Sequence, residues 1–204
     1  RDFYSPERAT FASGMHAVIV ETDPETAEIR ILQYAVVHDC GTLINPMIVE
    51  GQIHGGVAQG VGGALYERMA YDSSGQLLNA SFMDFLMPYV TEVPTSIDID
   101  HLETPSPLNP LGIKGAGEAG VIPTSAAIAA AVEDAENIPI VRMPISPSEL
   151  YALRRAGGST EPLVNTMPGT QSITWVHPGS VRGTDSDPFP RGDAATPTES
   201  EASA

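Results

Sequence analysis

The feature that most constrains the fold is a proline-free segment, residues 48–69, which combines a helical apolar pattern with six glycines. Ile53, Val57, Val61, Ala64 and Leu65 recur at near-helical spacing, so we predict one helix over this segment. Glycine inside a helix costs roughly 1 kcal/mol relative to alanine, so these glycines need a reason in packing. We expect another backbone or a ligand to approach the helix closely. The glycines are Gly51, Gly55, Gly56, Gly60, Gly62 and Gly63.

Short apolar segments on both sides of this helix have the pattern of strands. Residues 12–20 alternate small and apolar side chains, residues 21–26 are rich in turn formers, and residues 29–38 form an apolar run. This order predicts a β-hairpin. Further strands are predicted at residues 77–89, 96–101 and 138–142.

Two helices are predicted in the second half of the chain. Residues 124–135 are rich in alanine, with Thr124 or Ser125 as the cap. Residues 146–149 read Ser-Pro-Ser-Glu, a capping box with proline at the first helical position, which starts a helix over residues 149–156. Helices and strands together predict an α+β fold over residues 1–156.

Residues 157–204 differ in composition from the rest of the chain. They are dominated by Gly, Pro, Ser, Thr and acidic residues, and their few apolar residues have no period apart from a short run around Trp175. Such a segment cannot bury enough apolar surface to offset its ordering entropy. We predict a disordered tail, with a possible strand or docking peptide around Trp175.

Composition excludes several classes of protein. The formal net charge of -16 repels a phosphate backbone and an anionic membrane surface, so no nucleic acid is expected as a partner. One cysteine, Cys40, excludes an internal disulfide framework and an iron–sulfur site built by this chain alone, and favours the cytoplasm. No apolar run is long enough to span a membrane. Because the chain starts at Arg1 without a methionine, we interpret it as a fragment of a longer polypeptide.

The loop of residues 114–120, Lys-Gly-Ala-Gly-Glu-Ala-Gly, is the first candidate for chemistry. Its glycines allow backbone N–H groups to approach a ligand, Lys114 adds charge, and Glu118 stands just before a helix N-terminus. This combination suits an anionic cofactor, and a glutamate among apolar and glycine neighbours suits a general base. The alternative is an ordinary turn whose glutamate is solvated or caps the next helix.

A dinucleotide site is a second interpretation of the same loop, because Gly115, Gly117 and Gly120 have G-x-G-x-x-G spacing. The context speaks against it. A dinucleotide site needs a buried strand directly before the first glycine, and prolines interrupt the segment where that strand would lie. Glu118 would also direct negative charge toward a pyrophosphate.

Two further clusters have both a chemical and a structural interpretation. His38, Asp39 and Cys40 end a predicted strand, where Asp39 can bond the turn at Gly41 and Cys40 can pack as a small hydrophobic residue. We favour that interpretation over a metal or thiol site. Among the polar residues of the glycine-rich helix, Gln52 has an amide that can both donate to and accept from a ligand. His54 and Gln59 lie on the same predicted helix. In the structural interpretation, which we favour for isolated residues, all three are polar residues of the core or the surface.

Three motifs, taken in order, resemble a known family. They are HDCGTLINP at residues 38–46, GQIHGGVAQG at residues 51–60 and NPLGIKGAGE at residues 109–118. This order resembles the second molybdopterin-binding domain of the large subunit in the xanthine dehydrogenase and aldehyde oxidase family. The resemblance covers residues 11–156. The residues of these motifs are most similar to the carbon monoxide dehydrogenase-like and bacterial aldehyde or heterocycle dehydrogenase branch.

The resemblance implies a role for each motif. Glu118 matches the general base of a hydroxylation that takes its oxygen from water, and Gln52 matches a cofactor contact. The loop residues Lys114, Gly115, Ala116 and Gly117 match a second contact to the cofactor. The implied cofactor is molybdenum with molybdopterin, in the cytosine dinucleotide form, and no side chain of this chain is implied as a metal ligand.

The resemblance also implies partners. Electrons would leave through the pterin to [2Fe-2S] centres and FAD on partner chains or domains, in a dimer of heterotrimers that includes the remainder of the large subunit. We expect the chain to be inactive alone. The substrate class implied by the resemblance is carbon monoxide, an aldehyde or an N-heterocycle. The alternative is a non-catalytic scaffold of the same fold.

Overall fold

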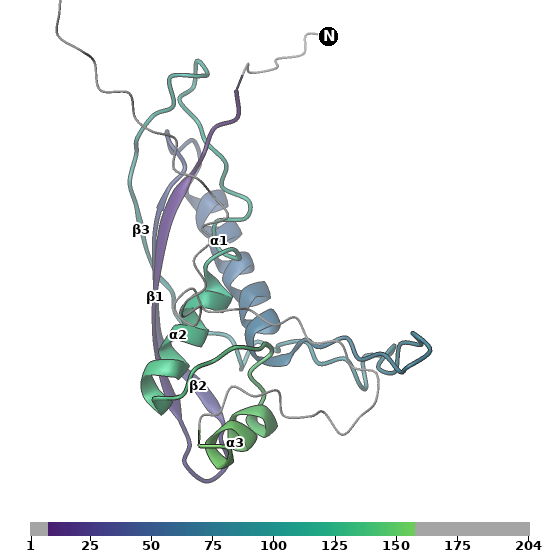
Figure 1. The fold of residues 1–204 in the computed structure, drawn as a ribbon. Coiled ribbons are helices and arrows are strands. Elements are labelled where there is room, and N and C mark those ends of the chain that lie inside the picture. Colours follow the sequence, from purple (N-terminus) through teal and green to yellow (C-terminus); the bar gives the residue numbers. More distant parts are fainter. Residues whose placement is uncertain (1–7, 158–204) are drawn as a thin grey trace, which may run out of the picture.

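The computed structural model describes residues 8–157 of the 204 residues, and the predicted tail therefore lies outside the described residues, apart from Gly157. A three-stranded sheet in the order β1-β2-β3 forms one layer, and the helices α2 and α1 cover one of its faces (Figure 1). The core lies between this sheet face and the helices. The expected α+β class is confirmed. No helix in residues 8–157 is long and apolar enough to cross a bilayer.

The predicted hairpin is present as β1, Ser13–Thr22, and β2, Ile29–Asp39. They pair antiparallel, from Ser13 opposite Asp39 to Thr22 opposite Ile29, with one register shift between Ile19 and Val20. The predicted strand at residues 96–101 is shortened to β3, Asp98–His101, which runs parallel to β2 and pairs His101 with His38. The sheet therefore delivers the ends of β2 and β3 side by side.

The glycine-rich helix is α1, Pro46–Val61, with Asn45 as its N-cap: the Asn45 side chain accepts a hydrogen bond from the Ile48 amide. It ends earlier than the predicted Met69 because a π-helical turn, η1, Gly62–Tyr66, follows. In that turn the Glu67 amide bonds the Gly62 carbonyl at 2.8 Å. The wider turn leaves the Ala64 carbonyl to accept from the Ile145 amide at 2.7 Å.

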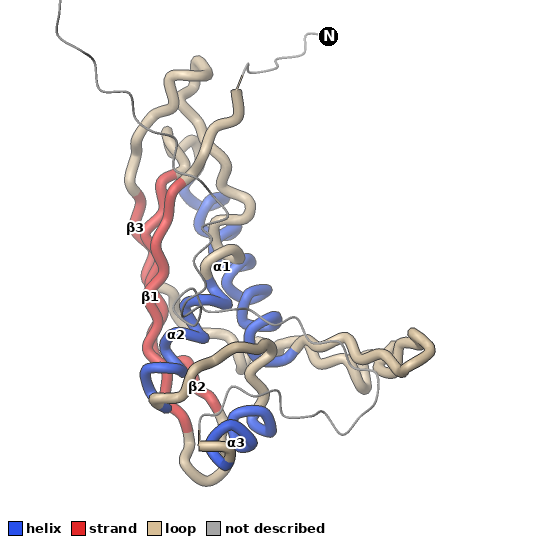
Figure 2. Tube along the Cα trace, viewed as in Figure 1, coloured by secondary structure: helices blue, strands red, loops and turns tan. Residues whose placement is uncertain are grey.

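The strands predicted at residues 77–89 and 138–142 are wrong. Residues 77–89 belong to a loop between η1 and β3 that projects away from the body (Figure 2), and its apolar side chains are exposed, with Phe82 at 81% and Met83 at 89%. Leu77 forms one isolated bridge with Tyr71, and no strand of the described residues pairs with the rest of this segment. In the second segment Pro139 lacks the N–H that a strand interior requires.

The last two helices are α2, Thr124–Glu136, and α3, Pro147–Arg155. One half of the capping box is present at α3: the Ser146 side chain accepts from the Glu149 amide, and Pro147 occupies the first turn. The Glu149 carboxylate instead lies 3.6 Å from the Arg68 guanidinium. The expected cap of α2 is wrong: Pro123 is the N-cap residue, and neither Thr124 nor Ser125 caps the helix. Both hydroxyls instead bond to other segments, as described below.

Candidate functional site

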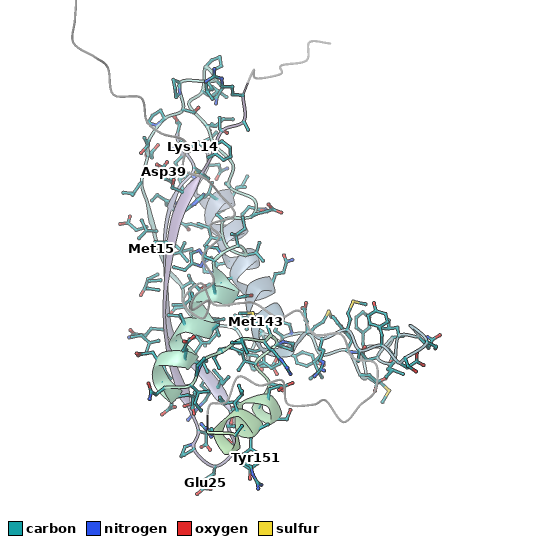
Figure 3. All side chains as sticks on the ribbon, in the orientation of Figure 1. Met15, Glu25, Asp39, Lys114, Met143 and Tyr151 are labelled. Atoms are coloured by element: carbon teal, nitrogen blue, oxygen red, sulfur yellow. The ribbon has the colours of Figure 1, made fainter. Side chains whose placement is uncertain are left out.

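The 114–120 loop is anchored at its start by the end of β2. The Asp39 carboxylate accepts from the Gly41 amide at 2.8 Å, the Thr104 amide at 3.1 Å and the Lys114 ammonium at 3.2 Å. Figure 3 shows Asp39 and Lys114 at the same end of the molecule. The Lys114 amide also donates to the Cys40 carbonyl at 2.7 Å. Lys114 therefore holds the loop against β2 with both of its donor groups.

The same contacts set the charge at this point. Hydrogen bonds from the Thr104 hydroxyl and from the Gly41 and Thr104 amides, together with Lys114, hold the pKa of Asp39 well below its usual range. The carboxylate is thus ionised beside the ammonium, in a place where both side chains are largely buried. The predicted bond from Asp39 to the turn at Gly41 is present.

Beyond Lys114 the loop offers unpaired backbone donors. Within the described residues, the amides of residues 115–120 donate to no acceptor. Residues 115–119 form one wall of a cleft of about 770 Å³, whose other walls are residues 10–14, His38, Ile122 and Pro123. A run of free N–H groups on a cleft wall suits an anionic or carbonyl-rich ligand.

Glu118 lies on this wall. Its side chain is exposed, and its carboxylate has no hydrogen bond or ion pair with any residue in 8–157. Its carbonyl is engaged instead, accepting from the amides of Val121 at 3.1 Å and Ile122 at 3.2 Å. The backbone at Glu118 is therefore fixed while both carboxylate oxygens remain able to accept a proton.

Gln52 reaches the loop from α1. Its side-chain oxygen lies 4.0 Å from the position that a Cβ on Gly117 would occupy. The side chain is exposed, and it does not line the cleft. The structure thus brings Gln52 beside Gly117, although Gln52 itself does not line the cleft.

Close packing of glycines sets the distance between α1 and the loop. A Cβ on Gly56 would lie 2.7 Å from two backbone carbons of Gly120, and one on Gly120 would collide with the Ile53 backbone. A Cβ on Gly60 would collide with Thr124, and the Ser125 hydroxyl donates to the Gly60 carbonyl at 3.2 Å. The expected close approach is present at Gly56 and Gly60.

At Gly55 no segment of the described chain makes the expected close approach. A Cβ on Gly55 would meet nothing within 4 Å, and the same is true of Gly51. Both residues are exposed. The sequence pattern could not separate the two classes, because adjacent glycines on a helix lie about 100° apart around its axis and only one of them faces the loop.

The neighbours of Asp39 agree with the structural interpretation. Cys40 is 5% exposed and packs in the core, and burial raises the pKa of its thiol. His38 is 2% exposed and lines the cleft, and burial lowers the pKa of its imidazole. The sequence did not point to His16, Tyr34 and Thr124, whose hydrogen bonds hold the end of the loop. These three residues lie far apart in sequence, so no motif marks them.

A dinucleotide site at Gly115 is not supported by the fold. Gly115 is preceded by a loop whose Ile113 forms an isolated bridge with Gly41, just after β2, and not by a strand of the sheet. The next helix starts only at Thr124, nine residues later. The strand–turn–helix unit that this motif requires is absent from these residues.

Comparison with known proteins gives the family. Residues 1–94 match the model of the molybdopterin cofactor-binding domain. The nicotine 6-hydroxylase large subunit of Paenarthrobacter nicotinovorans is 46% identical over 132 residues, 65% of this chain and 16% of that protein. The carbon monoxide dehydrogenase large chain of Hydrogenophaga pseudoflava is 41% identical over 136 residues, 65% of this chain and 16% of that protein. The chain belongs to the molybdenum hydroxylase large-subunit family.

A solved structure of this family has the same fold. Quinoline 2-oxidoreductase from Pseudomonas putida 86 matches with a TM-score of 0.67 at 50% sequence identity, over 69% of this chain and 18% of that chain. The chain spans about one sixth of the length of the curated relatives named above. The matched family model includes Gln52 and ends before the 114–120 loop.

The residues present fit a molybdopterin group. The free amides of residues 115–118 can donate to phosphate or carbonyl oxygens, and the Gln52 amide can both donate and accept. The contact between Gly56 and Gly120 leaves no room for a Cβ atom, so α1 and the loop are packed directly against each other. The Gln52 amide and the loop amides therefore belong to one packed unit.

Proposed function

We propose that the chain forms part of the catalytic large subunit of a molybdenum hydroxylase, with Glu118 as the general base. The observation that carries this proposal is a carboxylate that is free of partners within the described residues, on a cleft wall whose backbone amides are also free. The substrate is a small carbon compound: carbon monoxide, an aldehyde or an N-heterocycle. The oxygen that it gains comes from water.

The cofactor-binding residues of this proposal are Gln52, Gly115, Ala116 and Gly117, through one side-chain amide and the backbone amides of the loop. Lys114 contributes by anchoring the loop to Asp39 and Cys40. When bound, the molybdenum–molybdopterin group supplies a two-electron acceptor beside the substrate. The cytosine dinucleotide form of the pterin is part of the proposal.

Glu118 acts at its carboxylate oxygens. The carboxylate takes a proton from the attacking oxygen nucleophile, and the hydrogen bonds to the Glu118 carbonyl hold the backbone from which this side chain extends. Closure of the cleft by the remainder of the large subunit would exclude water from the carboxylate.

The partners follow from what this chain lacks. Its single cysteine is buried in the core, so the [2Fe-2S] centres belong to partner chains, as does FAD. We propose a cytoplasmic dimer of heterotrimers, in which each large subunit contains one copy of this chain. A multi-subunit arrangement is supported by the relative that is 41% identical, because that protein is named as the large chain of carbon monoxide dehydrogenase.

The test is Glu118→Gln in the full enzyme complex, with Glu118→Asp as the conservative variant. Glutamine keeps the size of the side chain and loses the proton acceptor, so turnover should fall by at least about 100-fold while molybdenum content stays at the parent level. Aspartate should retain part of the turnover. Near-normal turnover of a molybdenum-replete Glu118→Gln enzyme contradicts the assignment and favours a scaffold of the same fold.

A further inference from the structure

A chain of hydrogen bonds joins three elements to the end of the 114–120 loop. His16 on β1 contacts the Tyr34 hydroxyl on β2 through Nδ1 at 2.8 Å, and Tyr34 donates to the Thr124 hydroxyl at the start of α2 at 2.9 Å. His16 Nε2 lies 3.1 Å from the Ala119 carbonyl, and the Thr124 hydroxyl donates to the Gly120 carbonyl at 2.6 Å. Both ends of the chain therefore hold the two residues that follow Glu118.

The surroundings make these bonds strong constraints. Tyr34 is 2% exposed and Thr124 is fully buried, so an unmade bond at either hydroxyl would leave a buried polar group without a partner. The His16 and Tyr34 rings meet edge to face, with centroids 5.6 Å apart. The chain is thus packed as well as bonded.

The acceptor at Ala119 fixes the tautomer of His16. A carbonyl only accepts, so Nε2 carries the hydrogen, and in the neutral ring Nδ1 has none. Because the Tyr34 hydroxyl has a single hydrogen, it donates either to Nδ1 or to the Thr124 hydroxyl, and these two contacts share that hydrogen. Burial is the main cause that lowers the pKa of His16, and His38 lowers it further, against a smaller raising effect of the Ala119 carbonyl. The neutral ring is the form present at pH 7.

We propose that His16 is a positioning residue for Glu118, acting through the Ala119 carbonyl and, by way of Tyr34 and Thr124, through the Gly120 carbonyl. The inference rests on the proposed function, because Glu118 is the group that it positions. The carbonyl of Glu118 itself is held by the amides of Val121 and Ile122. The carbonyls of residues 118–120 are therefore all engaged, that of Ala119 by His16 on β1 and that of Gly120 by Thr124 on α2.

The experiment compares His16→Leu with His16→Gln in the full enzyme complex. Leucine fills space and makes neither bond, whereas glutamine is neutral and has one donor and one acceptor, as the proposed tautomer does. Met15→Gln is the matched control, because Met15 is adjacent on β1 and 69% exposed. Three quantities are measured: hydrogen exchange of the Val121 and Ile122 amides, molybdenum content, and kcat with KM.

With His16→Leu, exchange at these two amides should rise at least about fivefold, because the turn that contains them loses its support. In the same variant kcat should fall about 10- to 100-fold with KM and molybdenum content near the parent values, as for a misplaced reacting group. His16→Gln should restore exchange and most of kcat, and Met15→Gln should match the parent.

Tyr34→Phe keeps the ring and removes only the hydroxyl, so it tests the same chain if His16→Leu does not assemble. It should also raise exchange at Val121 and Ile122. Parental exchange in the variants that assemble overturns the inference, and so does a fall in kcat that glutamine fails to rescue. Normal turnover of Glu118→Gln would instead overturn the proposed function, and the exchange result does not depend on catalysis.

Discussion

Substitution of Gly56 by alanine should destabilise the protein, although alanine is the better helix former. A Cβ at this position would lie 2.7 Å from two backbone carbons of Gly120, whereas ordinary contact begins at 3.4 Å. The α1 helix and the loop must therefore separate by roughly 0.7 Å, and neither side can yield by rotating a side chain. Overpacking of this kind costs about 1 to 3 kcal/mol.

Gly55 is the matched control, because it is the adjacent residue on the same helix and has open space at the Cβ position. Gly55→Ala should stabilise by about 0.4 to 1 kcal/mol through the reduced freedom of the unfolded chain. The two alanine variants should therefore differ by at least about 1 kcal/mol in the free energy of unfolding, with Gly56→Ala the less stable.

The assay is the thermal midpoint and molybdenum content of the full complex carrying each variant. Gly56→Ala should melt below the parent and hold less molybdenum, because the shifted loop presents its amides in a changed position. Gly55→Ala should melt at or above the parent with full molybdenum. The reasoning is refuted if Gly56→Ala melts as high as Gly55→Ala and keeps its metal.

Three further predictions concern the end of β2 and the cysteine that follows it. Lys114→Met removes the ammonium from the largely buried Asp39, and should cost about 1 to 3 kcal/mol at pH 7. Because the pKa of Asp39 is lowered in the folded chain, its contribution is present above the unfolded pKa near 3.8 and is lost as pH falls toward the folded value. Asp39→Asn should abolish that part of the acid sensitivity, and urea midpoints from pH 7 down to about pH 2 measure it. Cys40 should resist alkylation at pH 7.5 until denaturant is added, since burial raises its pKa. Mass spectrometry of the Cys40 peptide measures this, and rapid labelling of the native complex would contradict it.

The parts of the fold that the sequence predicted are those in which local pattern and tertiary packing agree. The hairpin of β1 and β2 follows from alternation around a turn, and α3 follows from its capping box at Ser146. The end of α1 was not predictable, because η1 depends on Ile145, whose amide bonds the Ala64 carbonyl 81 residues away. The cap of α2 failed for a similar reason: the Thr124 hydroxyl bonds Gly120 and Tyr34, and the Ser125 hydroxyl bonds Gly60.

The sequence motifs of the candidate site were predictable, but the spatial contacts between them were not. The motifs located Gln52 and the 114–120 loop, and the structure adds that Gln52 lies beside Gly117 while Lys114 is engaged by Asp39 and Cys40. The support from His16 carries no sequence signal, because its contact with Ala119 joins residues 103 positions apart. The boundary between residues 156 and 157 stays a prediction.

Metal and pterin analysis of the purified full-length complex tests the central claim most directly. We expect about one molybdenum per large subunit and a pterin that is released on denaturation. Acid hydrolysis of that pterin should release cytidine monophosphate. A complex that is fully assembled, contains iron and flavin, and yet has neither molybdenum nor pterin would contradict the account.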